Sequence, residues 1–148
     1  MALDYEAIGE AIRARFATAA TPASEDALAL TTVEPPAQIG ATPALIVHPP
    51  EEDLEWGPGG VRHSVQRWPV RFYRTEGDLG PSLTALSKWR KAFLDTVVGQ
   101  VQLGLSTYVD WAEIRSVAVR QFDYAETRYD GLEFMVWVKT REPVTAAA

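Results

Sequence analysis

The sequence of 148 residues contains no cysteine and only two histidines, His48 and His63. The absence of cysteine excludes disulfide bonds, thiolate catalysis and zinc sites built on cysteine. Two histidines cannot make a structural zinc site by themselves. We therefore expect no metal and no cofactor. A single domain of this length can bury a sufficient core without either.

Positive charge is also scarce, with 14 Lys and Arg against 20 Asp and Glu and a net charge of −6. This balance argues against a protein whose main task is to neutralise DNA phosphates. No apolar run approaches the roughly 18 residues of a membrane span. The opening stretch MALDYEAIGE lacks the basic and apolar regions of a secretory signal. We expect a soluble protein without a membrane partner, made in the cytoplasm.

The pattern of apolar residues and turns predicts one α+β domain over residues 1–148, in the order α-β-β-α-β-β. Apolar residues at helical spacing predict a helix that begins after Asp4, which suits the N-cap position, and a second helix within 80–99. Four strands are predicted, at 44–48, 61–75, 113–124 and 132–140. Asp130-Gly131 is a turn signal between the last two strands, and Pro69 suggests that the strand at 61–75 is an edge strand or contains a bulge. The expected fold is a four-stranded, mainly antiparallel sheet with both helices packed on one face.

Three further segments are expected to be irregular. Residues 21–43 contain five prolines and glycines that break helices, and we interpret them as a long proline-rich arm, with a short strand near 28–33 as the alternative. Residues 51–60 read as an acidic, glycine-rich loop, and residues 141–148 as a flexible C-terminal tail.

Three patterns resemble chemical motifs, but each has a simpler interpretation. The stretch GPGG at 57–60 lacks the Gly-Lys-Ser/Thr ending of a phosphate-binding loop. The acidic residues of 51–55 lack the spacing of a calcium-binding loop. His63 and Ser64 are neighbours on a strand, so their side chains point to opposite faces and cannot act as a base and a nucleophile together. We expect a protein that is not an enzyme.

The last predicted strand is apolar on both faces. Leu132, Phe134, Val136 and Val138 share one face, whereas Met135 and Trp137 lie on the other. Helices on one side of the sheet would cover only the first set. Something else must cover Met135 and Trp137.

An arginine-rich strand offers two interpretations. Arg67, Arg71 and Tyr73 share one face of the strand at 61–75, opposite the apolar Trp68 and Phe72. The pattern resembles a platform for single-stranded nucleic acid, or else a basic face that meets acidic loops of another subunit. Trp56, alone in an acidic segment, is either folded back on the domain or anchors a contact.

Five stretches together resemble a known family over nearly the whole chain, from Asp4 to Thr140. They are the opening helix, PALIVHPP after the proline-rich segment, QRWPVRFYR, LSKWRKAFLDTV and the closing YDGLEFMVWVK. This layout resembles the tail terminator (tail completion) proteins of long-tailed bacteriophages and their relatives among minor tail and head-tail joining proteins.

The resemblance implies a structural protein of the virion tail or neck, assembled in the cytoplasm of a bacterial host. Such proteins form rings, typically hexamers, that bind the end of the tail tube, stop its polymerisation and offer a surface to the head connector or stopper protein. The partners would be further copies of the chain, the tail tube protein and the connector, and DNA could pass through the ring without sequence-specific binding.

In such a ring the neighbouring subunit would cover the second face of the last strand. The candidate interface residues are Met135, Trp137, Arg67, Arg71, Tyr73 and Trp56. The alternatives are a head-tail connector or minor tail protein of the same fold and, from a different class, a small module that binds single-stranded nucleic acid.

Overall fold

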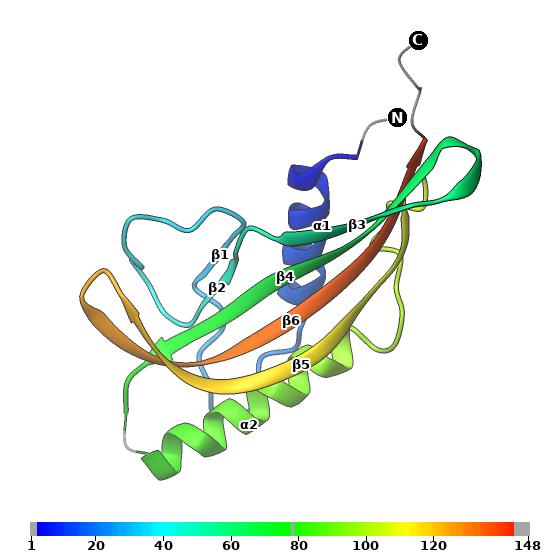
Figure 1. Cartoon of the computed structure of the whole chain (residues 1–148). Coiled ribbons are helices and arrows are strands. Elements are labelled where there is room, and N and C mark those ends of the chain that lie inside the picture. Colours follow the sequence, from blue (N-terminus) through cyan, green and yellow to red (C-terminus); the bar gives the residue numbers. More distant parts are fainter. Residues whose placement is uncertain (1–2, 78, 144–148) are drawn as a thin grey trace.

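Two helices lie on one side of a six-stranded mixed sheet in the computed structural model, which describes residues 3–77 and 79–143 (Figure 1). The strands β2, β4, β6 and β5 pair in that order through antiparallel ladders, and β1 adds to β2 in parallel. Strand β3 pairs with β4 beyond the end of β2. The elements are α1 (Tyr5–Ala17), β1 (Leu30–Thr32), β2 (Ala44–Val47), β3 (Glu51–Trp56), a 3₁₀ turn (Pro58–Gly60), β4 (Val61–Thr75), α2 (Leu79–Thr96), β5 (Val109–Tyr124) and β6 (Thr127–Pro143).

The predicted four-stranded, mainly antiparallel sheet is therefore wrong, and the observed order is α-β-β-β-β-α-β-β. One missed strand, β1, lies in the proline-rich segment, where the structure favours the alternative of a short strand. The other, β3, lies in the acidic segment 51–60 that we expected to be a loop. Acidic residues have poor strand propensity, and β3 forms because it pairs along its whole length with β4.

Strand β6 is also longer than predicted at both ends. It continues to Pro143, so the first three residues of the expected C-terminal tail are part of a strand, and residues 144–148 lie outside the described residues. At its start, the turn of the β5–β6 hairpin is formed by Ala125 and Glu126, which both have positive φ. The expected turn at Asp130-Gly131 is wrong. Gly131 lies inside β6, where a Cβ atom would overlap with the carbonyl oxygen of Phe72.

The helices bury the core against one face of the sheet, here called the inner face. Asp4 caps α1 as predicted, because its carboxylate accepts hydrogen bonds from the amides of Glu6 and Ala7. Helix α1 contributes Ile8, Ile12 and Phe16, and α2 contributes Leu86, Trp89 and Phe93. They pack on the inner-face residues of β4 and β6, which include Trp68, Val70, Phe72, Leu132, Phe134, Val136 and Val138.

Proline at position 69 is tolerated although β4 runs through the middle of the sheet. We expected Pro69 to mark an edge or a bulge. In the structure, β2 pairs with Val70–Tyr73 and β3 pairs with Arg62–Arg67, so Pro69 lies opposite the break between these two strands. Its carbonyl accepts from the amide of His48 at 2.8 Å. The missing N–H points to the same side, so no hydrogen bond to β6 is lost.

Candidate functional site

The opposite face of the sheet, here called the outer face, is covered at one end by the chain itself. Outer-face side chains of β2, β4, β5 and β6 form a second, smaller core there, made of Ala44, Ile46, Tyr73, Phe122 and Tyr129. Ile39 of the proline-rich segment packs on this cluster, and the Tyr124 hydroxyl donates to the carbonyl of Pro36. The segment interpreted as an arm is thus anchored on its own sheet.

Tyr73 belongs to this second core and not to an accessible surface. The alternation placed it correctly on the same face as Arg67 and Arg71, but its side chain is fully buried. Its hydroxyl lies 3.1 Å from Nε2 of His48, and burial raises the pKa of Tyr73. Another protein cannot reach Tyr73, so we withdraw it from the candidate interface.

Met135 and Trp137 lie further along the outer face, beyond the second core formed with the proline-rich segment, and both are half-buried in the described part of the chain. The Trp137 ring lies between two arginines, with the guanidinium of Arg115 at 4.8 Å and that of Arg67 at 5.9 Å from its centre. Contacts of this kind are favourable because the negative face of the ring attracts the cation. The chain's own arginines therefore partly shield the indole that we expected to need a neighbour.

Ion pairs surround these two residues on the outer face. Arg67 pairs with Asp53 at 2.5 Å, while Arg71 and Arg120 hold the two oxygens of Glu133 at 2.8 and 3.2 Å. Further pairs join Arg67 to Glu51, Arg115 to Glu113 and Lys139 to Glu55. Met135 and Trp137 with this ring of charges form what we call the outer patch.

The arginine-rich strand β4 does not place its large aromatic rings beside its arginines on an exposed surface. Its aromatic residues Trp68 and Phe72 are buried on the inner face, so they cannot stack with bases. Its arginines are paired with carboxylates: Arg62 with Glu142, Arg67 with Asp53, Arg71 with Glu133 and Arg74 with Glu25.

Trp56 is exposed and is not folded back on the domain. Its ring is 69% accessible, and it points to the inner side of β3, as does Leu54, which is 53% accessible. The guanidinium of Arg62 lies 5.4 Å from the centre of the Trp56 ring. Two large apolar side chains therefore project from a six-residue edge strand.

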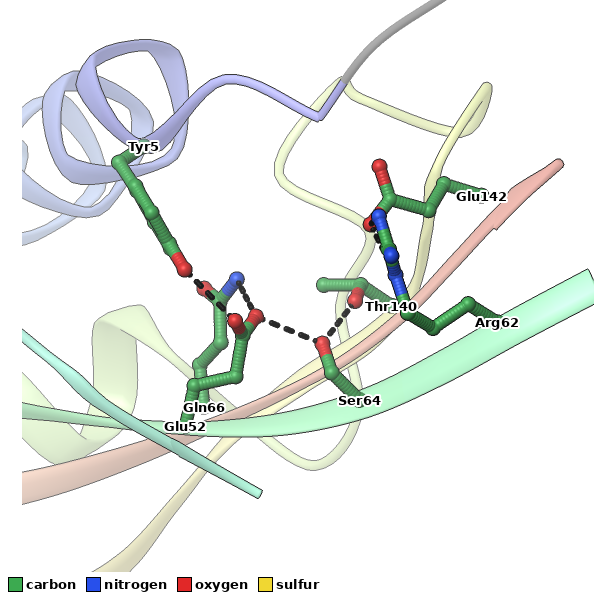
Figure 2. Close-up of polar contacts among 7 residues, drawn as sticks. All are labelled: Tyr5, Glu52, Arg62, Ser64, Gln66, Thr140 and Glu142. Carbon is green, nitrogen blue, oxygen red and sulfur yellow. Dashed lines mark hydrogen bonds and ion pairs between the residues drawn. The ribbon is translucent and has the colours of Figure 1, made fainter. Parts of the chain in front are cut away.

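A polar cluster holds β3 against α1 and β4 (Figure 2). The Glu52 carboxylate accepts hydrogen bonds from the Tyr5 hydroxyl at 2.6 Å, from Ser64 Oγ at 2.9 Å and from Gln66 Nε2 at 2.9 Å. Ser64 also shares a hydrogen bond with Thr140 of β6. Sequence reasoning missed this cluster because its partners come from three separate elements.

The cluster has the chemistry of a structural anchor. Burial alone would raise the pKa of Glu52, but the hydrogen bonds from Tyr5, Gln66 and Ser64 outweigh it and lower the pKa. The hydrogen bond to Glu52, with burial, raises the pKa of Tyr5 to about 12. A carboxylate with a lowered pKa is a poor general base for Ser64. Glu52 instead stabilises the β3–β4 hairpin, because its hydrogen bonds join β3 to α1 and to β4.

Other functional classes find little support in the described part of the chain. Among residues 3–77 and 79–143, no three His, Asp or Glu side chains are grouped so that they could hold a metal ion. Neither described helix combines the length and apolarity needed to cross a bilayer.

A scan of the chain against protein-family models finds no match, and a search of curated protein sequences likewise finds no similar protein. Function is therefore inferred from the residues and their arrangement.

Proposed function

We propose that this protein is a structural assembly protein of a long-tailed bacteriophage, which forms a ring at the end of the tail tube, ends its polymerisation and provides the joint to the head connector. The observation that carries the proposal is the outer patch. Its two apolar side chains, Met135 and Trp137, remain partly accessible on the outer face of the sheet in the described part of the chain. The resemblance of the sequence to tail terminator proteins supports the same function.

The outer patch has the layout of a protein interface. Trp and Met are enriched at the centres of such interfaces, and the surrounding rim is usually polar. Here Trp137 and Met135 occupy the centre, and ion pairs such as Arg71–Glu133 lie around them. Because the patch lies on strands rather than on loops, it keeps its shape before binding, which lowers the entropic cost of association.

Capping a tube in this way requires no catalysed reaction and depends only on binding affinity. A terminator stops growth if it occupies the last ring of tube subunits more tightly than further tube subunits do. A preference of about 1.4 kcal/mol corresponds to a tenfold difference in affinity. A closed ring that presents several copies of the same patch multiplies a small preference per subunit, because the contacts are made together.

A connector or minor tail protein of the same fold would use the outer patch for a different tail or neck partner. Binding of single-stranded nucleic acid is not favoured, because the arginines of β4 are paired with carboxylates and the stacking residues are buried.

The proposal is tested first by the oligomeric state of the purified protein. Size exclusion with light scattering is expected to give a mass of about 98 kDa for six copies of the 16.3 kDa chain, if the ring is a hexamer. Electron microscopy of the same fraction should show closed rings. A monomer at every concentration, together with tails that lack a ring of this protein, would contradict the proposal.

A further inference from the structure

The sheet has edge strands on both sides: the short β1 and then β3 lie on one side, and β5 lies on the other. Among the described residues, β3 pairs only with β4 (Figure 1). The first residues of β5 bridge to Val101 through Ala112, but its residues 113–124 pair only with β6. An edge strand presents unpaired backbone N–H and C=O groups, which can pair with a strand from another chain.

The directions of the strands allow the two edges to join. Strands β3, β4, β6 and β5 are each antiparallel to the next, so β5 runs opposite to β3. If a second copy follows in the same orientation, its β3 lies antiparallel to the β5 of the first copy. The alternation of strand directions then continues without interruption from one subunit to the next.

The free part of β5 also fixes where β3 can pair. A bulge lies between Ile114 and Ser116, and from Ser116 to Tyr124 the strand is regular. Within this stretch Ser116, Ala118 and Arg120 face the outer side, while Val117 and Val119 face the inner side. On β3, Asp53 faces the outer side, and Leu54 and Trp56 face the inner side.

One register matches both faces at once. If Asp53 lies opposite Arg120, then Leu54 lies opposite Val119 and Trp56 lies opposite Val117. Leu54, Trp56 and Val119 are 53%, 69% and 56% accessible in the single chain, so this pairing covers three large exposed apolar side chains. A slip of one residue turns every side chain to the wrong face. A slip of two keeps a carboxylate, Glu51 or Glu55, opposite Arg120, but it sets Leu54 opposite Gln121 in one direction and Val119 opposite Glu52 in the other. Only the proposed register therefore pairs all three exposed apolar side chains with apolar partners.

The charges on the two edges are complementary. The outer side of β3 carries Glu51, Asp53 and Glu55, whose side chains are 84%, 69% and 72% accessible despite their pairs within the chain. The matching part of β5 carries Arg120, which is 55% accessible. Two copies of β3 would repel each other, so the charges favour contact of β3 with β5 over a symmetric β3–β3 contact.

We propose that subunits of this protein join edge to edge, with β3 of one copy pairing antiparallel to β5 of the next copy in the register that sets Asp53 opposite Arg120. The proposal rests on the proposed ring and names its subunit contact. It is a heterologous contact, in which each copy uses a different edge on each side, as a ring requires. The outer patch then remains free for the other partner of the ring, the end of the tail tube.

Cysteine crosslinking tests the register directly, because the natural chain has no cysteine. In the double variant Leu54→Cys/Val119→Cys, the two positions lie on opposite edges of the same sheet, at least about 14 Å apart across β4 and β6. Disulfides need Cα atoms closer than about 7 Å, so any disulfide must join two chains. Mild oxidation is expected to give a ladder of covalent oligomers that reductant collapses to the monomer.

Two controls make the result specific. In Leu54→Cys/Ser116→Cys the second thiol faces the outer side, three residues out of register, and is expected to give no ladder. The single variant Leu54→Cys reports any symmetric contact between β3 strands. The edge contact would be overturned by an equal ladder from Leu54→Cys/Ser116→Cys, by an equal yield of disulfide dimer from Leu54→Cys alone, or by no ladder from the matched pair.

A charge exchange provides an independent test. Asp53→Arg and Arg120→Asp are each expected to weaken self-association at least tenfold, and the double variant should restore it. If each charge acted only within its own chain, the double variant would self-associate as weakly as the worse single variant, and this result would overturn the proposal.

Electron microscopy of the oxidised Leu54→Cys/Val119→Cys variant distinguishes failure of the edge contact from failure of the tail function. Rings that form without the disulfide would reject the edge contact alone. Crosslinked rings that do not bind tail tubes would reject the tail function alone.

Discussion

Two substitutions three residues apart in β6 should have opposite effects. Phe134 is fully buried on the inner face, with ring centres at 5.5 Å from Phe16 and 5.4 Å from Phe93. Removing such a ring costs about 3–5 kcal/mol. In Phe134→Asp the new carboxylate is also buried without a partner, which adds several kcal/mol. Because domains of this kind are stable by only about 5–15 kcal/mol, Phe134→Asp should not fold.

Trp137→Asp should leave the domain folded. Position 137 is half-buried on the outer face, and the Arg67 and Arg115 guanidinium groups that contact the indole could pair with the new carboxylate. We expect a loss of about 1–2 kcal/mol, typical of a substitution outside the core. For a chain of this length, that corresponds to a fall in Tm of roughly 2–8 °C. Binding to the tube end is lost, because the charge would be buried only when the outer patch meets the tube. Ring formation through β3 and β5 should be retained.

Circular dichroism during heating and binding to the tube end measure the two effects. Phe134→Asp should show no cooperative transition, whereas Trp137→Asp should melt cooperatively and fail to bind. Trp137→Phe, which keeps an aromatic ring at this position, serves as the control that still binds the tube end. The reasoning is refuted if Trp137→Asp unfolds the chain or if it binds the tube end like the natural protein.

Three further predictions concern stability and are checked by urea unfolding. Burial, with the nearby Arg71, lowers the pKa of His48 to about 4 from an ordinary value of 6.5, so stability is full above pH 6.5 and falls by up to about 3 kcal/mol as the pH drops towards 4. His48→Gln should flatten this dependence, and an unchanged slope would contradict it. Glu52→Ala removes the acceptor of three hydrogen bonds and should cost about 1–3 kcal/mol, so an unaltered midpoint would disprove the anchor. Gly131→Ala should cost roughly 1–3 kcal/mol or more, because its Cβ overlaps with the Phe72 backbone, and a neutral effect would refute that close approach.

The parts of the fold that sequence reasoning predicted correctly depend on local signals. Asp4 and the apolar spacing after it identify α1, because capping and helical periodicity are properties of neighbouring residues. The alternation of β6 correctly separates Phe134 from Trp137 for the same reason. Strand β3 was missed because it is acidic and becomes a strand only through its partner β4. Asp130-Gly131 was wrongly interpreted as a turn. Glycine is needed at position 131 because the backbone of Phe72 approaches it closely, and not because the chain turns there.

The candidate interface on the outer face of the sheet was predicted only in part from the sequence. Alternation within each strand placed Met135 and Trp137, and likewise Arg67 and Arg71, on the side away from the core, and this is confirmed. The pairing of β4 with β6 brings the four residues onto one face of the sheet. The sequence could not show that the proline-rich segment folds back over Tyr73, because that contact joins residues distant in the chain. The pairing of each β4 arginine with a carboxylate was equally hidden, since the partners come from β3, β6 and the segment before β1.

Growth of the tail tube in the presence of this protein tests the central claim most directly. The tail tube protein of the proposed phage would be polymerised with substoichiometric amounts of the purified protein, and tube lengths would be measured by electron microscopy. The account predicts short tubes that carry one ring of this protein at one end, and normal lengths with Trp137→Asp. Tubes of unchanged length without a ring at their ends would contradict it.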